Sequence, residues 1–462
     1  MYRSAIEYLK AWGIRQSRKP LVIRGARQVG KTFIVREFAR EFQNYVEINL
    51  ETDIHVLSYF KSSDPKEIIE LLSLHYNTSI VPGQTLLFFD EIQAAPELFA
   101  KLRYFYELMP GLHVIAAGSL LEFILEEHEF SMPVGRIEYL HLGPMNFSEF
   151  LLSTGNGTLL DFLKKFSLGE TFPLPIHQKL VSLFKTFLIV GGMPESIKAY
   201  LDKRSFADSD RVKMNVLSTY MDDFSKYRKR INHELLTTVF KAMPSLTGSK
   251  VKYSTISNKH RSAEVAAALN RLFLSKICCP VYHCSARGIP LGAGRSDKVF
   301  KTLFLDVGLM CSALGLTMAN IVALDDVSLV NKGEISEQFA GQHLLYRKDF
   351  YYEPELYYWD RENPGSNAEV DYVIAHGPTI VPVEVKAGKT GSLKSLHLFV
   401  RERGLKTGVR MNLDVPSAVR CAGALPNSDR YDYNLISMPC YMIGELDRFL
   451  EDQTNKNPLN RD

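Results

Sequence analysis

Apolar residues near the N-terminus are first continuous and then recur at helical intervals. A short continuous run, Leu21–Ile23, leads into a loop bounded by glycines. After the loop, Phe33, Ile34, Phe38 and Phe42 recur at the intervals of one helix face. The pattern therefore predicts a strand, a loop and a helix, in that order.

Two more continuous apolar runs follow in the same part of the chain. TLLFFDEI covers residues 85–92, and HVIAAGS covers residues 113–119. Runs this short that are apolar on both faces are typical of buried strands in a parallel sheet. Together they predict an α/β core with a parallel sheet in residues 1–155.

The middle of the chain changes from a helical pattern to a mixed one. Residues from about 175 to 235 carry helical apolar stripes and end near Arg228, Lys229 and Arg230, which would either match a helix C-terminus or contact phosphate. In residues 236–318, the helical segments LLTTVFKAMPSL and RSAEVAAALNRLFLSK precede the strand-like segments ICCPVYHC and KVFKTLFLDVGLM. This order resembles a winged helix, which places a helix in the DNA major groove or serves as a packing or oligomer module.

The C-terminal part begins with a helical pattern, GEISEQFAGQHLLYRKDF, and continues with strands that are half apolar. In AEVDYVI, alternation predicts Val370, Tyr372 and Ile374 on one face and Glu369 and Asp371 on the other. A strand of this kind buries one face and leaves its carboxylates on the other.

The next strand, IVPVEVKAG, has the same alternation. Its three valines would face inward, and Glu384 and Lys386 would lie together on the opposite face. If the two strands are neighbours, Asp371, Glu384 and Lys386 converge. Strands of this kind also carry outward Glu and Lys as a simple cross-strand charge pair, so the pattern leaves both interpretations open.

The composition is that of an ordinary globular protein, with 46% hydrophobic and 23% charged residues. A length of 462 residues suggests about three or four domains. No apolar run reaches the roughly 18 residues of a membrane helix, and the polar, aromatic N-terminus is unlike a signal peptide. We therefore expect a cytoplasmic protein with no membrane partner.

The six cysteines lack the regular spacing of a disulfide framework or a paired zinc site, so reduced thiols are expected. In CCPVYHC, His283 lies beside Cys284, which would suit a metal or, more simply, a buried apolar strand.

Positive charge is concentrated in one segment. Residues 250–301 hold ten Lys or Arg against two acids, a local charge of +8 in a chain whose net charge is +3. The rest of the chain therefore carries −5. This segment is a candidate surface for a polyanion such as DNA.

The glycine-bounded loop fits the phosphate-binding pattern GxxxxGK[ST] in full. Its eight residues read GARQVGKT: Gly25, Ala26, Arg27, Gln28, Val29, Gly30, Lys31 and Thr32. The glycines let the backbone curl so that its N–H groups face the phosphates, Lys31 reaches the terminal phosphates, and the Thr32 hydroxyl ligates Mg²⁺. The position between a strand and a helix predicts a site for ATP and Mg²⁺.

Acidic and hydroxyl groups at the ends of the following strands complete this site. Asp90 would hold Mg²⁺ through water, and Glu91 would polarise the attacking water. Ser119 would either sense the γ-phosphate or simply form a turn. Arg136 would either neutralise charge in the phosphoryl-transfer state, in trans within a homo-oligomer, or form a surface salt bridge.

The order GARQVGKT, LLFFDEI, AAGSLL, PVGRIEYLHLGPMNFSEF and GGMPE resembles the bacterial and archaeal AAA-like ATPases joined to a C-terminal nuclease-like domain of unknown function. The resemblance covers essentially the whole chain. It implies a P-loop parallel-sheet ATPase core of the AAA+ or signalling type in residues 1–155, a helical lid in 156–235, a winged helix in 236–318 and a restriction-endonuclease-like α/β domain in 319–462. It also implies that GGMPE is a lid turn near the nucleotide; read alone, GGMPE is a Gly-Gly-Pro chain reversal.

The spacing D-x12-E-x-K looks like the core of PD-(D/E)xK phosphodiesterases, although no proline directly precedes Asp371. Asp371 and Glu384 would then hold Mg²⁺, and Lys386 would stabilise hydroxide or phosphate charge. The same resemblance implies that Glu337 completes the metal site. Two functions follow: an ATPase that controls a nuclease-like domain acting on or binding nucleic acid, or an ATP-gated interaction switch whose nuclease-like domain is silent.

Overall fold

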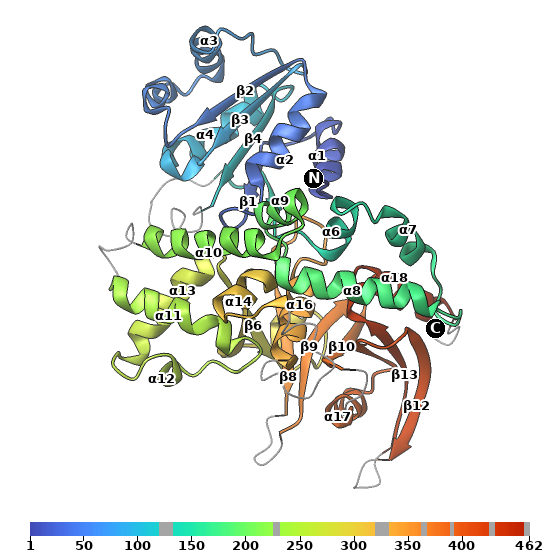
Figure 1. Ribbon diagram of the computed structural model, residues 1–462. Coiled ribbons are helices and arrows are strands. Elements are labelled where there is room, and N and C mark those ends of the chain that lie inside the picture. The colour runs from blue at the N-terminus through green and yellow to red at the C-terminus, as the bar shows by residue number, and fades with distance from the viewer. Residues whose placement is uncertain are drawn as a thin grey trace. The chain divides into compact units, whose positions relative to one another are not determined.

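The computed structural model describes residues 1–119, 133–224, 232–318, 332–361, 367–388, 392–424 and 430–456 (Figure 1). The cluster Arg228–Arg230 lies outside these residues. The chain forms two compact units, each built from several segments. The N-terminal unit consists of Met1–Pro144, Leu274–Ile277 and Lys348–Pro354, and the C-terminal unit consists of Met145–Phe273, Cys278–Arg347 and Glu355–Asp462.

The N-terminal unit contains a five-stranded parallel sheet in the order β2-β3-β4-β1-β5. Its strands are β1 (Leu21–Arg24), β2 (Asn44–Asn49), β3 (Thr85–Asp90), β4 (His113–Gly118) and β5 (Glu138–His141). Its main helices are α1 (Ala5–Gly13), α2 (Lys31–Phe38), α3 (Pro65–His75) and α4 (Pro96–Leu108). Every residue of β3 and β4 is buried, as expected for central strands covered on both faces. The predicted parallel sheet is confirmed.

Helices α3 and α4 cover one face of this sheet. Leu72 of α3 and Phe99 of α4 belong to one buried cluster with Leu87, Phe89 and Val114 of the central strands. On α1 and α2, Trp12 and Phe38 pack edge to face, with ring centroids 6.2 Å apart. The apolar runs of the sequence thus become the core that fixes the ends of the strands.

Residues from far along the sequence complete the N-terminal unit at β5. The backbone N–H of His141 donates to the carbonyl of Phe350 at 2.7 Å, and the ring of Phe350 lies 5.7 Å from that of Tyr8. In contrast, α6 (Phe147–Ser153) belongs to the C-terminal unit. The compact unit therefore differs from the contiguous segment 1–155, because a long-range backbone hydrogen bond extends the edge of the sheet.

The C-terminal unit is built on an eight-stranded mixed sheet in the order β12-β13-β11-β10-β9-β8-β6-β7. Its strands are β6 (Cys278–Cys284), β7 (Arg295–Phe304), β8 (Leu356–Asp360), β9 (Glu369–His376), β10 (Thr379–Val385), β11 (Thr407–Asn412), β12 (Ser417–Ala424) and β13 (Arg430–Pro439). Its helices of seven or more residues are α6, α7 (Gly157–Lys165), α8 (Leu174–Val190), α9 (Pro194–Lys203), α10 (Phe206–Asp223), α11 (His233–Leu246), α13 (Ser262–Leu274), α14 (Val307–Ala313), α16 (Lys332–Leu345), α17 (Lys394–Glu402) and α18 (Leu446–Lys456). The helical character expected from about 175 to 235 is confirmed in the described residues.

The segment expected to form a winged helix has the predicted order of elements. Helices α11, α12 (Tyr253–Ile256) and α13 precede the antiparallel hairpin of β6 and β7. However, β6 also pairs in parallel with β8, from Val281 opposite Leu356 to His283 opposite Tyr358. The boundary expected at residue 318 therefore does not separate two sheets, since β8 satisfies the backbone groups that the edge of β6 would otherwise expose.

The strand expected to run through LDVGLM is shorter than predicted. β7 ends at Phe304, and Asp306 caps α14 by accepting a hydrogen bond from the N–H of Leu309 at 3.0 Å. The other oxygen of Asp306 accepts from the N–H of Gly192 at 2.6 Å. A Cβ at Gly191, where φ is +76°, would lie 2.2 Å from Asp306 Oδ1. GGMPE is therefore a tight turn between α8 and α9 that packs on a buried carboxyl of its own unit.

In the described residues, no single helix has the length and apolar composition to cross a membrane. The pair α8 and α9, joined at a bend of 119°, meets these two criteria only when counted together. The six cysteines are free thiols, as expected, and five of them are buried.

Candidate nucleotide site and carboxylate cluster

The loop GARQVGKT connects β1 to α2, as its sequence predicts. Gln28 and Gly30 have φ values of +66° and +95°, in the left-handed region that allows the tight curl. A Cβ on Gly25 would lie 2.3 Å from the carbonyl oxygen of Leu142, which directly follows β5. The loop is thus pressed against backbone, and only glycine fits at its start.

Lys31 is the first residue of α2 and is buried. Its ammonium donates to the carbonyls of Gly25 at 2.9 Å and Ala26 at 2.8 Å, so the charge lies over the loop. The N-terminus of α2 adds partial positive charge at the same place. This arrangement favours an anion such as a phosphate group.

Thr32 and Asp90 lie side by side, although they are far apart in sequence. The Thr32 hydroxyl donates to Asp90 Oδ2 at 2.8 Å, and Asp90 Oδ1 accepts from the N–H of Glu91 at 3.0 Å. Burial raises the pKa of Asp90, and the hydrogen bond from Thr32 opposes this rise. The two side chains predicted as Mg²⁺ ligands therefore form one local pair.

Glu91 is held by a residue that the sequence patterns did not indicate. It has a φ of +52°, and one of its carboxylate oxygens accepts a hydrogen bond from Gln93 Nε2. A Cβ on Gly118 would lie 2.6 Å from Gln93 Oε1, so the end of β4 leaves room for this side chain. Gln93, two residues after Glu91, therefore contacts the Glu91 carboxylate, a contact that the sequence patterns did not indicate.

Ser119 lies beside the phosphate loop, because Arg27 Nε donates to its hydroxyl oxygen at 3.2 Å. Arg136 does not join this site within the unit. Its Nε donates to Glu107 Oε1 at 2.8 Å, and the two side chains are 45% and 42% exposed. Arg136 lies just before β5, at the edge where the parallel strands begin, whereas the loop follows the end of β1. Within its own unit, Arg136 thus forms the surface salt bridge that was one of its two interpretations.

Arg3 supports the phosphate loop from the N-terminus of the chain. Only 3% of its surface is exposed, and its guanidinium donates to the carbonyl of Val29 at 3.1 Å and to that of Gly143 at 2.8 Å. It therefore ties the loop to the segment after β5. A single arginine at the start of a chain gives no sequence signal for this role.

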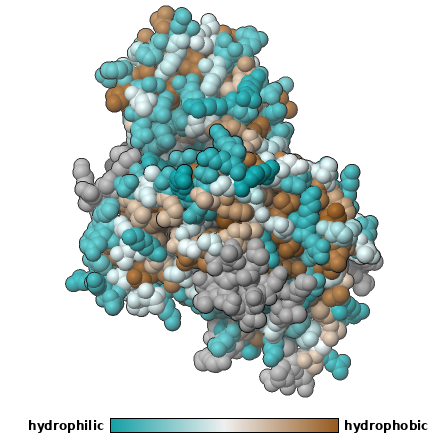
Figure 2. Space-filling model, viewed as in Figure 1, coloured by the Kyte–Doolittle hydropathy of each residue, from teal (hydrophilic) through white to brown (hydrophobic). Residues whose placement is uncertain are grey.

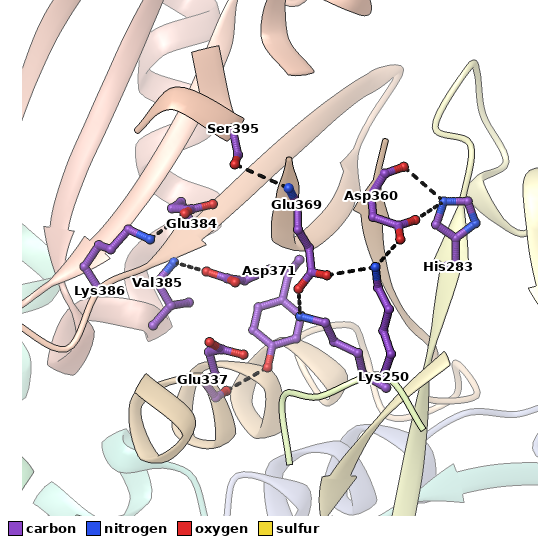
Figure 3. Close-up of polar contacts among 12 residues, drawn as sticks. Lys250, His283, Glu337, Asp360, Glu369, Asp371, Glu384, Val385, Lys386 and Ser395 are labelled. Atoms are coloured by element: carbon purple, nitrogen blue, oxygen red, sulfur yellow. Dashed lines mark hydrogen bonds and ion pairs between the residues drawn. The ribbon is translucent and has the colours of Figure 1, made fainter. Parts of the chain in front are cut away.

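The C-terminal unit gathers a second set of charged residues where β9, β10 and α16 meet (Figure 3). Lys386 Nζ contacts Glu384 Oε1 at 2.5 Å, and Asp371 Oδ2 accepts from the N–H of Val385 at 2.8 Å. Figure 3 shows Asp371 between Glu384 and Glu337, which comes from α16. We call Glu337, Asp371, Glu384 and Lys386 the carboxylate cluster, and the structure brings these four predicted residues together.

The pairing of β9 with β8 is irregular between Val370 and Val373, the stretch that contains Asp371. Val373 pairs with Tyr357 and Val370 with Trp359, so three steps on β9 match two on β8. As a result Val370 and Val373 share one buried cluster, whereas the Tyr372 hydroxyl donates to the carbonyl of Glu337 at 2.8 Å. The strict alternation expected for AEVDYVI is wrong here, because a β-bulge inserts one residue and rotates the side chains that follow.

Two lysines that precede the cluster in sequence also reach this region. Lys301 of β7 is ion-paired with Glu369 Oε1, and Lys250 lies 3.3 Å from Glu369 Oε2. Lys250 also contacts Asp360, whose Oδ1 lies 2.9 Å from His283 Nε2. These contacts depend on the continuous sheet, so the sequence did not predict them.

Comparison with known protein families gives a match to the part of the chain that holds the nucleotide site. Residues 17–151 match the AAA domain family. They form an ATPase-like domain that contains the phosphate loop, Asp90 and Glu91, as the sequence predicted. Residues 181–320 and 332–435 match two domains of unknown function, DUF8612 and DUF4143. None of the curated proteins compared with the chain matches it.

Several solved structures resemble the chain weakly. A Walker-type ATPase of Pyrococcus abyssi is 16% identical, with a TM-score of 0.44 over 68% of this chain and 95% of its own. The ORC2 protein of Aeropyrum pernix is 11% identical, with a TM-score of 0.35 over 71% of this chain and 96% of its own. DnaA of Aquifex aeolicus bound to AMPPCP is 14% identical, with a TM-score of 0.26 over 59% and 89%. Likenesses this weak carry no argument about activity.

All three carboxyl groups of the carboxylate cluster have raised pKa values. Burial raises the pKa of Glu384 to about 7, and the charge of Asp371 adds to the rise. Burial likewise raises the pKa of Asp371, and it raises that of Glu337 well above its usual range, with repulsion from Asp371 as the next cause. For Lys386, burial alone would lower the pKa, but Glu384 and Asp371 raise it overall. The acids of the carboxylate cluster therefore share one poorly solvated environment.

The carboxylate cluster does not form a closed metal site in the observed arrangement. Within the described ranges, no three His, Cys, Asp or Glu side chains are arranged to hold a metal ion. This includes His283, which contacts Asp360 and lies in a buried strand. Glu384 Oε2, however, is buried without a hydrogen-bond partner, and an orphaned carboxylate oxygen of this kind needs a proton or a cation. The donor types suit a hard cation, although Lys386 and Val385 occupy two of the oxygens.

The basic segment is only partly available to a partner. Lys250, Lys301 and Arg295 are paired with carboxylates of the same unit. The other exposed cations of the segment are Lys252, Lys259, Arg261, Arg287 and Lys298, on the α12–α13 region and the β6–β7 hairpin. The local excess of positive charge is thus smaller at the surface than in the sequence.

Proposed function

We propose that the AAA domain binds ATP with Mg²⁺ and hydrolyses it. The observation that carries this proposal is the hydrogen bond from Thr32 to Asp90, which joins the phosphate loop to the acidic end of β3. Lys31 would exchange its two carbonyl contacts for phosphate oxygens, and Thr32 and Asp90 would hold the metal ion. When bound, Mg²⁺ neutralises charge on the β- and γ-phosphates. Glu91, held by Gln93, would orient the attacking water.

Nucleotide binding and hydrolysis can be tested separately. Lys31→Ala should abolish binding of a fluorescent ATP analogue, because it removes the buried charge at the phosphates. Glu91→Gln should keep binding and lose phosphate release, because it removes the group that polarises water. Lys66→Ala, at an exposed position of α3, is the matched control and should change neither. Hydrolysis at the wild-type rate in Lys31→Ala would refute the proposal.

A second function, metal-dependent cleavage of phosphodiester bonds, is favoured by the convergence of Glu337, Asp371, Glu384 and Lys386. The three carboxylates would hold Mg²⁺, which supplies a Lewis acid and an activated water. Lys386 would place its ammonium near the attacking oxygen or the phosphate. The ATP state of the AAA domain would control this activity.

Contact with nucleic acid is proposed through the exposed cations of the α12–α13 region and the β6–β7 hairpin. If several phosphates are contacted, log K should fall steeply with log salt, because counterions are released. Replacing Lys259, Arg261 and Lys298 with Ala should then reduce the slope by about three. An affinity that does not depend on salt would favour a protein partner.

The alternative is an ATP-gated interaction switch whose carboxylate cluster is silent. The observation that favours it is the internal pairing of the carboxylates with lysines. The two functions separate in a cleavage assay on single- and double-stranded DNA and on RNA, with and without ATP. Loss of cleavage in Asp371→Ala and Glu384→Ala, together with an effect of ATP, supports the coupled nuclease. Intact ATP hydrolysis without cleavage of any substrate supports the switch.

A homo-oligomer is proposed only through Arg136. Its exposed position at the edge opposite the phosphate loop would let it reach the nucleotide of a neighbouring copy. Arg136→Ala should then reduce hydrolysis without weakening ATP binding, and mixing it with Lys31→Ala protein should restore activity. Failure of the mixture to recover activity would leave Arg136 as a surface salt bridge.

A further inference from the structure

Lys301 differs from the other charged groups near the carboxylate cluster in where it comes from and how deeply it is buried. It lies on β7, a strand of the hairpin that precedes the cluster in sequence, and only 3% of its side chain is exposed. Its ammonium is ion-paired with Glu369 Oε1 and lies 5.1 Å from the ring centroid of Tyr358. A buried ammonium of this kind is stable only where it has counter-charges.

Those counter-charges are the groups that a divalent ion would need. The ammonium of Lys301 interacts electrostatically with Glu337 and Asp371 as well as with Glu369. Lys250 approaches the other oxygen of Glu369 at 3.3 Å, which fixes this carboxylate between two lysines (Figure 3). Glu384 Oε2 is buried without a hydrogen-bond partner and is therefore an open acceptor for a cation. Positive charge is thus already present among the carboxylates.

We propose that Lys301 is the resident cation of the carboxylate cluster and that a divalent metal ion binds there only by displacing its ammonium from the surrounding carboxylates. This inference rests on the proposed metal site and adds the residue that sets its affinity. Lys301 is a positioning residue: it controls the charge and orientation of the carboxylates from β7. Lys298 also lies on β7. Nucleic acid bound at the β6–β7 hairpin and a metal ion bound at the carboxylate cluster would therefore act on the same strand.

Binding of Mn²⁺ to the full-length protein without nucleotide tests this directly, with the loss of the free Mn²⁺ signal in electron paramagnetic resonance as the readout. The phosphate loop contributes little under these conditions, since Mg²⁺-type ions bind there largely through nucleotide phosphates. Lys301→Met should bind Mn²⁺ at least about ten-fold more tightly than wild type, because it removes a like charge and frees an oxygen of Glu369. Lys301→Arg and the control Lys241→Met, at an exposed position of α11, should match wild type.

The location of the bound ion needs its own variant. Adding Glu384→Gln to Lys301→Met should remove the gain, since it takes away a carboxylate of the cluster. If the gain survives, the ion lies elsewhere and the proposal is wrong. Equal or weaker Mn²⁺ binding by folded Lys301→Met would also overturn it.

Lys301→Met leaves Glu369, whose side chain is 30% exposed, with one of its two lysine partners, Lys250, so this variant could lose stability. The pair Glu369→Gln and Glu369→Gln/Lys301→Met avoids this, because the double variant removes both charges. Within that background, removal of Lys301 should again tighten Mn²⁺ binding about ten-fold, and no gain refutes the role of Lys301. Cleavage is scored separately: a gain in Mn²⁺ binding without cleavage of any nucleic acid leaves Lys301 as proposed and rejects the nuclease.

Discussion

Replacing Arg3 with Met should loosen the phosphate loop from a distance in sequence. The guanidinium donates to the carbonyls of Val29 and Gly143 from a buried position. A hydrogen bond from a charged donor contributes about 1.5 to 3 kcal/mol, and the variant leaves two carbonyls without this donor. Two such bonds give an expected loss of about 3 to 6 kcal/mol in the free energy of local opening. Methionine keeps most of the volume, so the loss reports the hydrogen bonds.

Hydrogen–deuterium exchange of the peptide that spans residues 21–32 measures this opening locally, which suits a chain with two units. Exchange in this peptide should speed up by two orders of magnitude or more, and ATP affinity should fall. Arg3→Lys should recover only part of the loss, because a single ammonium does not span both carbonyls. Arg40→Met, at a surface pair with Glu37, is the control and should change little. Unchanged exchange and unchanged ATP affinity in Arg3→Met would refute the support role.

Three further predictions follow from the two sites. Gly25→Ala should greatly weaken ATP binding, measured by titration with a fluorescent analogue. The added Cβ would lie 2.3 Å from the Leu142 carbonyl oxygen, so the loop must move. Gly83→Ala, where no atom lies within 4 Å, tests a glycine without a close neighbour and should keep ATP binding. Gln93→Ala should lower the hydrolysis rate without changing ATP affinity, since it frees Glu91 but leaves the loop intact; equal loss of both would contradict a positioning role. The pKa of Glu384 rises from an ordinary 4.5 to about 7 on folding, so the native state holds a proton that the unfolded state releases. The free energy of unfolding should therefore fall by up to about 3 kcal/mol as pH rises from about 4.5 through 7. In denaturation curves, Glu384→Gln should remove this pH dependence. If the wild type and Glu384→Gln show parallel curves of stability against pH, Glu384 is not the group responsible.

The phosphate loop and the acidic end of β3 could be predicted from sequence because each is a local pattern. GARQVGKT dictates a curl between a strand and a helix, and a continuous apolar run before Asp90 and Glu91 dictates a buried strand that ends in carboxylates. The same local reasoning placed Asp371, Glu384 and Lys386 near one another. It overestimated the length of β7, because it missed Asp306 as a helix cap.

Alternation failed at β9 for a physical reason. A bulge changes which side chains share a face, and its position depends on pairing with β8 rather than on the residues of β9 alone. Tyr372 therefore reaches α16 although the period of two placed it with Val370. Local patterns cannot show such an insertion, since the partner strand is part of the cause.

The sequence by itself thus determined which chemical groups the chain carries and the elements that hold most of them. Only the tertiary structure decided which distant groups meet: Arg3 at the phosphate loop and Lys301 at the carboxylates. The reason is that the periodicity of a helix or strand shows only which side chains within a few residues share a face. These contacts depend instead on which segments join each sheet. The exposed edge of a strand pairs with a strand that satisfies its backbone hydrogen bonds, and here β6 pairs with β8.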